Sequence, residues 1–164
     1  MLIVERRLGE IKVKMVAVYE QMAKEGEAVP KPDPGFLSAF RIARILGETG
    51  PLQDFPNVEA LIKFAGLNLR ERKSGQYKGE VHLSKKGRSP LRAVLGETAF
   101  GLVKKKCAYG PYYHGKKERG MVGTKILAVV ERKLLCAFFI LGRTRAAFDQ
   151  NRLGLCESQY QKAA

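Results

Sequence analysis

Residues 121–141 read MVGTKILAVVERKLLCAFFIL, and their apolar positions recur at helical spacing. The pattern predicts a long helix that forms the central element of the core. Its longest purely apolar run, 134–141, is far shorter than the ~20 residues that a membrane-spanning helix needs. The N-terminus places charge after its apolar residues, the reverse of a secretory signal. We therefore expect a cytoplasmic protein. The apolar face of this helix comprises Val122, Ile126, Val129, Val130, Leu134, Ala137, Phe138 and Leu141.

Helix signals also precede this stretch. Ser38 is a suitable N-cap for a helix that ends at Gly47, and Asn57 for a short helix that ends at Gly66. Residues 91–104 read as a further helix. Residues 107–120, rich in tyrosine and glycine, are expected to form a loop, whereas 81–83 alternate in the manner of a small hairpin. The fold class predicted is mainly α, a compact helical domain with a basic loop or small hairpin.

The N-terminal residues 1–25 carry a heptad pattern. Apolar residues are spaced alternately three and four apart, as in the seam of a coiled coil: Met1, Val4, Leu8, Ile11, Met15, Val18 and Met22. Two interpretations remain open, a coiled coil that joins two or more copies and an amphipathic helix packed on its own domain. The proline-rich segment 26–34 is interpreted as a linker, 35–153 as the main domain and 154–164 as a flexible tail.

The charge of the chain is unusual. Thirty Lys and Arg against sixteen Asp and Glu leave a net charge of +14, which favours polyanions, nucleic acid before anionic membrane. The three cysteines (Cys107, Cys136 and Cys156) are widely spaced, and neither they nor the two histidines follow a metal-binding pattern. The sequence therefore predicts no metal site in this chain.

The densest positive charge lies between positions 70 and 92, where eight Lys and Arg accompany only two Glu. Ser74 and Gly75 stand within this cluster. A hydroxyl in such a field suits a phosphodiester, because the cations neutralise phosphate charge. A Ser-Gly pair between charged segments is also a common turn. The cations and hydroxyl predicted to contact nucleic acid are Arg70, Arg72, Lys73, Lys78, Ser84, Lys85, Lys86, Arg88 and Arg92, with Gly75 permitting close backbone approach.

Several motifs in register resemble the C-terminal domain of the insertion-sequence 110/116/902 transposases, the bridge-RNA-guided recombinases. The resemblance spans roughly 33–150, and the heptad helix resembles the coiled coil that precedes that domain. One departure is Gly35-Phe36-Leu37, where the family has a second glycine in a phosphate-binding hairpin. The matching motifs are Pro34-Gly35-Phe36, 42–46, Asp54-Phe55, Ala65-Gly66-Leu67, Ser74-Gly75, 83–87, Leu91-Arg92, 125–135 and Phe148-Asp149.

The resemblance implies DNA strand cleavage and rejoining in transposition, with Ser74 as the nucleophile. It also implies a guide RNA, and a RuvC-like half whose four acidic residues bind magnesium. No such acidic motifs occur in 1–30, so we expect a truncated or split enzyme that binds DNA, forms a dimer or tetramer through 1–25, and does not cleave alone. The alternative is a nucleic-acid-binding remnant or regulator without catalysis. A third interpretation is a helical oligomerisation module whose charge confers solubility.

Overall fold

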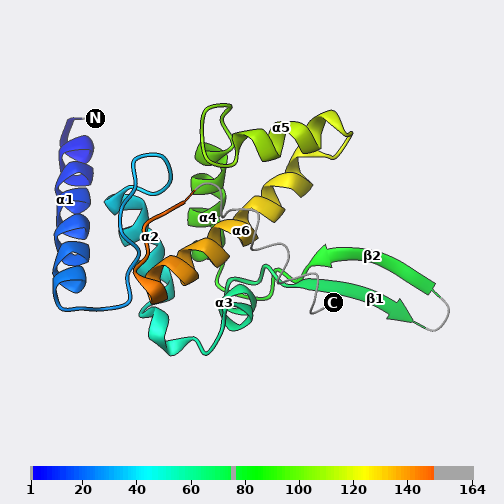
Figure 1. The fold of residues 1–164 in the computed structure, drawn as a ribbon, viewed down its shortest axis with the longest axis horizontal. Coiled ribbons are helices and arrows are strands. Elements are labelled where there is room, and N and C mark those ends of the chain that lie inside the picture. The colour runs from blue at the N-terminus through cyan, green and yellow to red at the C-terminus, as the bar shows by residue number, and fades with distance from the viewer. Residues whose placement is uncertain (1, 75–76, 150–164) are drawn as a thin grey trace. The chain divides into compact units, whose positions relative to one another are not determined.

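The structure, a computed structural model, describes residues 2–74 and 77–149, and their side chains except those of 2 and 71–81. As predicted, it is mainly helical, with six α-helices and one two-stranded sheet in the described residues (Figure 1). The chain divides into two compact units. The terminal unit comprises Met1–Asp54 and Phe138–Ala164, and the central unit comprises Phe55–Ala137.

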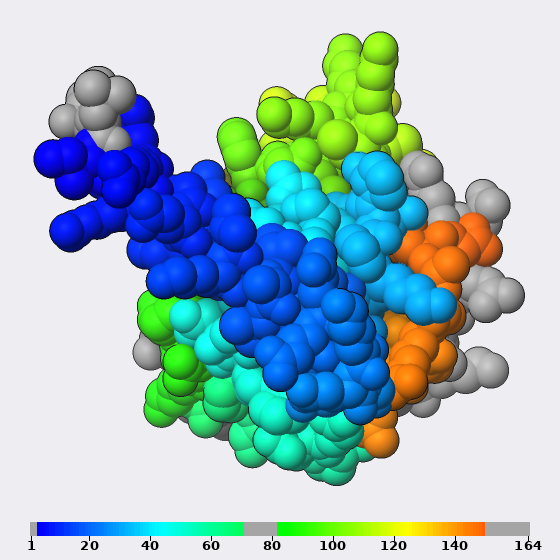
Figure 2. Space-filling model, turned by 90° about the vertical axis from the view of Figure 1, so that its left-hand side faces the viewer, coloured from blue at the N-terminus to red at the C-terminus, as the bar shows by residue number. Residues whose placement is uncertain are grey.

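In the terminal unit, α1 (Leu2–Lys24) packs against α2 (Ala39–Thr49) through its C-terminal half. The Tyr19 hydroxyl of α1 donates a 2.8 Å hydrogen bond to the Pro30 carbonyl. Val29 and Pro30 are both buried, so part of the proline-rich segment 26–34 packs against this unit. The N-terminal turns of α1, dark blue in Figure 2, stand clear of α2.

Ser38 caps α2 as predicted, because its Oγ accepts the Arg41 N–H at 3.4 Å. The sequence predicted that this helix ends at Gly47, and that prediction is wrong. The helix continues to Thr49, and Gly50, with a φ of 74°, forms the C-cap. A single glycine inside a helix costs only about 1 kcal/mol, whereas Gly50 followed by Pro51 stops it because proline lacks a backbone donor.

Residues 33–37 correspond to the segment that, by the resemblance, forms a phosphate-binding hairpin in the family. In this chain the segment contributes side chains to the core. Phe36 and Leu37 are buried, and the Phe36 ring stacks on Phe148 with ring centroids 4.0 Å apart. Asp33 accepts the Gly35 N–H through Oδ1 at 2.8 Å. Gly35 has no positive φ. This turn therefore uses its side chains and backbone within the terminal unit.

In the central unit, α3 (Val58–Ala65) is capped by Asn57 and by Gly66, both as predicted. The helix α4 (Ser89–Leu102) buries the predicted face of Leu91, Val94, Leu95 and Ala99. The helix α6 (Gly123–Thr144) belongs to the central unit up to Ala137, and its Ile126, Val130 and Leu134 are fully buried there. Phe138, the first α6 residue of the terminal unit, is fully buried as well. Val122 was predicted to be part of this face and is instead 58% exposed, because α6 begins one residue after it.

Residues 107–120 are not a loop, which corrects the prediction. They contain α5 (Gly110–Glu118), and Pro111 stands in its first turn, where its missing N–H would have no helical partner anyway. Tyr109, just before α5, is buried and anchors the helix start on the core. Tyr112 of α5 lies beneath the buried Lys133 of α6, with Nζ 4.6 Å from the ring centroid.

The predicted small hairpin exists and is longer than expected. The strand β1 (Leu69–Ser74) pairs antiparallel with β2 (Tyr77–Leu83), from Leu69 opposite Leu83 to Ser74 opposite Tyr77. The register shifts between Glu71 and Lys73, so that β2 carries one extra residue. Such a bulge bends and twists a hairpin.

Candidate nucleic-acid interface

A set of hydrogen bonds fixes the hairpin to the helices. These bonds join residues 64–68 to residues 84–92, and we call these two segments together the hairpin base. Three backbone bonds join the segment after β2 to the last turn of α3 and the residues that follow it: Ser84 N–H to Asn68 O at 2.8 Å, Lys85 N–H to Gly66 O at 2.9 Å, and Arg88 N–H to Phe64 O at 2.8 Å. The Arg92 guanidinium adds a bond to the Ala65 carbonyl at 3.0 Å. Two motifs of the family resemblance, 65–67 and 83–87, thus hold each other.

Two glycines make this close approach possible. Gly66 has a φ of 72°, a conformation that L side chains rarely adopt. A Cβ at Gly87 would lie 2.5 Å from the Phe64 carbonyl oxygen and 2.8 Å from the Ala65 carbonyl carbon, and would collide with the Gly66 nitrogen. The hairpin base therefore has no room for a side chain at position 87.

The predicted cations at the hairpin base face solvent, with one exception. Arg70, Lys85, Lys86 and Arg88 are exposed, and Lys85 adopts a left-handed φ of 52°. Arg92 is half-buried, and its guanidinium donates to the Ala65 carbonyl. Its position gives Arg92 a structural role in the hairpin base.

Arg92 also influences a carboxyl group of α6. Burial raises the pKa of Glu131, and the positive charge of Arg92 lowers it by a smaller amount. Glu131 contacts the backbone of α4 closely, since a Cβ at Gly96 would lie 3.2 Å from its Oε1. This carboxyl therefore sits against α4.

Ser84 accepts the Lys86 N–H through its Oγ at 3.3 Å, a local turn contact. Ser74 is the last residue of β1, at the end of the hairpin remote from the hairpin base (Figure 1). Arg72, Lys73 and Lys78 lie along the same two strands. Gly75 lies outside the described residues.

A second group of residues was not predicted from the sequence. A groove of about 630 Å³, which we call the hairpin groove, is lined by two parts of the chain. One part is the end of the hairpin near the hairpin base, and the other is α6 from Thr124 to Arg132. Three of its residues, Lys125, Ala128 and Arg132, are spaced three and four apart on one face of α6, and Thr124 and Val129 lie beside them. A search for basic residues at helical spacing within 121–141 would have found Lys125 and Arg132. The lining is Leu69, His82, Leu83, Lys85, Thr124, Lys125, Ala128, Val129 and Arg132.

Within the part of the chain that the structure describes, no three His, Cys, Asp or Glu residues gather as metal ligands would. Among those same residues, no helix is both long and apolar enough to cross a membrane.

Comparison with protein families gives one match. Residues 36–114 match the model of the transposase IS116/IS110/IS902 family. The matched segment runs from Phe36 through the hairpin base and β1–β2 into α5. A search of curated proteins gave no match. The family match supports the relationship that the linked sequence motifs indicated, and it covers every predicted site residue.

Proposed function

We propose that this chain acts in the transposition of an insertion sequence, as a DNA-binding transposase component in which Ser74 attacks a phosphodiester. The observation that carries the proposal is the family match over 36–114, because it covers the hairpin, the hairpin base and the exposed cations together. By this proposal, the Ser74 oxygen bonds to the phosphorus while the bond from phosphorus to one sugar oxygen breaks, and that sugar leaves as a hydroxyl that takes up the proton lost by serine. A DNA hydroxyl then attacks the same phosphorus, which rejoins the strand and releases the serine. Further proposed partners are a guide RNA and a separately encoded acidic half.

The charge along the hairpin favours DNA as the partner. In the register of the hairpin Lys73 pairs with Lys78, so the two strands bring together two positions that both carry a lysine. Arg70, Lys85 and Lys86 add exposed positive charge toward the hairpin base. Positive charge gathered in this way attracts a polyanion, which supports a phosphate backbone as the ligand.

Salt dependence tests this proposal. We expect duplex DNA to be retained with a log affinity that falls with log salt at a slope of roughly −5, as about six neutralised phosphates would give. Fluorescence anisotropy over a salt series measures the slope. An affinity that does not change with salt, or no retention at all, would favour the oligomerisation module whose charge merely confers solubility.

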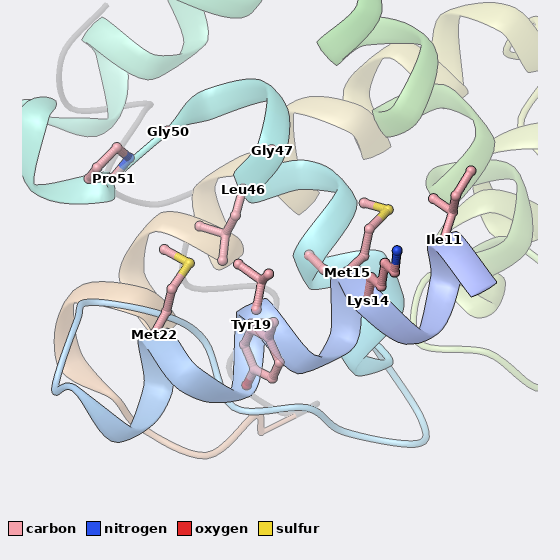
Figure 3. A pocket seen from close by; sticks show the side chains of 11 residues that line it. Ile11, Lys14, Met15, Tyr19, Met22, Leu46, Gly47, Gly50 and Pro51 are labelled. Carbon is pink, nitrogen blue, oxygen red and sulfur yellow. The ribbon is translucent and has the colours of Figure 1, made fainter. Parts of the chain in front are cut away.

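A second proposal concerns self-association through α1. Val4, Leu8, Ile11 and Val18 are each more than half exposed, although they occupy the seam of the heptad pattern. The C-terminal part of the seam borders an apolar groove of about 360 Å³ between α1 and α2 (Figure 3). Exposed apolar stripes of this kind indicate a partner surface. Heptad spacing suits the α1 helix of a second copy as that partner.

Paired substitutions on α1 separate the seam from general surface effects. We expect Leu8→Glu to convert a dimer or higher oligomer to monomer, because it places a charge at a seam position that is 51% exposed in one copy. Val13→Glu, also on α1, 70% exposed and outside the seam, is the matched control and should leave the oligomer intact. Light scattering coupled to size exclusion measures both. Equal masses for the two variants would refute the α1 seam.

A further inference from the structure

We propose that the hairpin groove binds an unpaired DNA strand, with phosphates on its cations and base faces on its apolar floor. The inference rests on the proposed function in that DNA is taken as the polymer. It goes further by assigning a strand state and a set of residues. Most of these residues, including Lys125 on α6, lie outside the cluster that the sequence singled out.

The charge of the groove suits phosphate. Lys85 comes from the hairpin base, and Lys125 and Arg132 come from α6, so cations border the groove on two sides. Lys85 and Lys125 are both exposed. No acidic side chain is among the described residues that line the groove. An anionic ligand therefore meets attraction from both walls and repulsion from neither.

The floor of the groove points to unpaired bases. Four residues of the lining are apolar, and we call them the floor of the groove: Leu69, which is 53% exposed, and Leu83, Ala128 and Val129. A duplex presents phosphates and base edges, so it would leave this surface wet. An unpaired strand can turn the flat faces of its bases onto planar side chains and can also cover apolar side chains with them, which removes apolar surface from water. The exposed imidazole of His82 offers one such planar group at the rim.

The placement relates the groove to the proposed nucleophile. Leu69 begins β1 and lines the groove, and Ser74 ends the same strand. The five steps along the strand from Leu69 to Ser74 span roughly 17 Å. A DNA strand seated in the groove and continuing along the hairpin would therefore be led toward Ser74.

The floor is tested with Leu69→Gln, a neutral change that leaves the net charge at +14. We expect Leu69→Gln to weaken binding of an oligothymidylate by about fivefold or more, since covering a half-exposed leucine side chain contributes on that scale. Binding of a duplex of equal length should stay unchanged. Val122→Gln is the matched control, because Val122 is similarly exposed at 58% and does not line the groove. Fluorescence anisotropy measures the affinity of the wild type and of each variant for both polymers.

The walls are tested with Lys125→Gln, an exposed position where folding is not at risk. We expect Lys125→Gln to weaken binding of the oligothymidylate by a larger factor than binding of the duplex. Lys117→Gln on α5, exposed and outside the groove, removes the same charge and should affect both polymers alike. Circular dichroism confirms folding, and Lys125→Gln decides the result should Leu69→Gln unfold.

Three outcomes would count against the inference. If the groove variants and the control variants change the affinities for the oligothymidylate and the duplex by equal factors, the groove does not bind the unpaired strand, although the proposed function survives. If an oligouridylate binds more tightly than the oligothymidylate with the same sensitivity to the groove variants, the assignment to DNA is wrong. If the wild type retains neither polymer, the proposed function itself fails.

Discussion

Gly87→Ala is expected to destabilise the chain by about 3 kcal/mol, because the added methyl group meets rigid backbone on three sides. The carbon of this methyl group would lie 2.5 Å from the Phe64 carbonyl oxygen and 2.8 Å from the Ala65 carbonyl carbon. No flexible side chain can move aside there. To make room, the hairpin base must open and lose bonds such as Lys85 N–H to Gly66 O. Thermal unfolding should shift down by roughly 10 °C.

Gly115→Ala is the matched control for this substitution. Gly115 lies inside α5 of the same unit, and an added Cβ there would meet nothing within 4 Å. Alanine is the better helix former, so this variant should be more stable than wild type by up to about 1 kcal/mol. Differential scanning calorimetry compares the two. Equal unfolding temperatures for Gly87→Ala and wild type would show that the hairpin base is not closely packed.

The sequence predicted those elements whose signals are local. Caps at Ser38 and Asn57 and the apolar face of α4 were read correctly, because each depends on residues within one or two turns. The helix α5 was missed because Gly110 and Pro111 resemble a loop. The full hairpin was missed because β1 is stabilised by its antiparallel pairing with β2, and the charged segment 70–73 has no alternation of its own.

The site was predicted in part for the same reason. Lys85, Lys86 and Arg88 are adjacent in sequence, and they are exposed together at the hairpin base. Arg92 follows them in sequence, but its guanidinium contacts the Ala65 carbonyl, which only the pairing of distant segments places within reach. The contribution of α6 to the hairpin groove likewise depends on tertiary packing that no local pattern encodes.

Ser74→Ala is expected to reduce transposition by at least about a thousandfold, because removing a nucleophile removes the covalent step itself. The frequency is measured in cells that carry the insertion sequence with the gene at its own locus. Covalent protein–DNA adducts, which survive denaturation, are measured in the same cells and should disappear. Duplex affinity should stay within about twofold, because the substitution leaves every cation in place.

Ser84→Ala provides the control that separates the two hydroxyls. Ser84 lies in the segment that forms the hairpin base, and its Oγ accepts the Lys86 N–H, so its loss should cost about 1 kcal/mol of stability and leave adducts intact. Ser74, by contrast, ends β1 opposite Tyr77. If Ser84→Ala abolishes adducts while Ser74→Ala does not, the nucleophile is misassigned. If both variants transpose normally, the chain serves transposition by binding alone, which is the regulator interpretation.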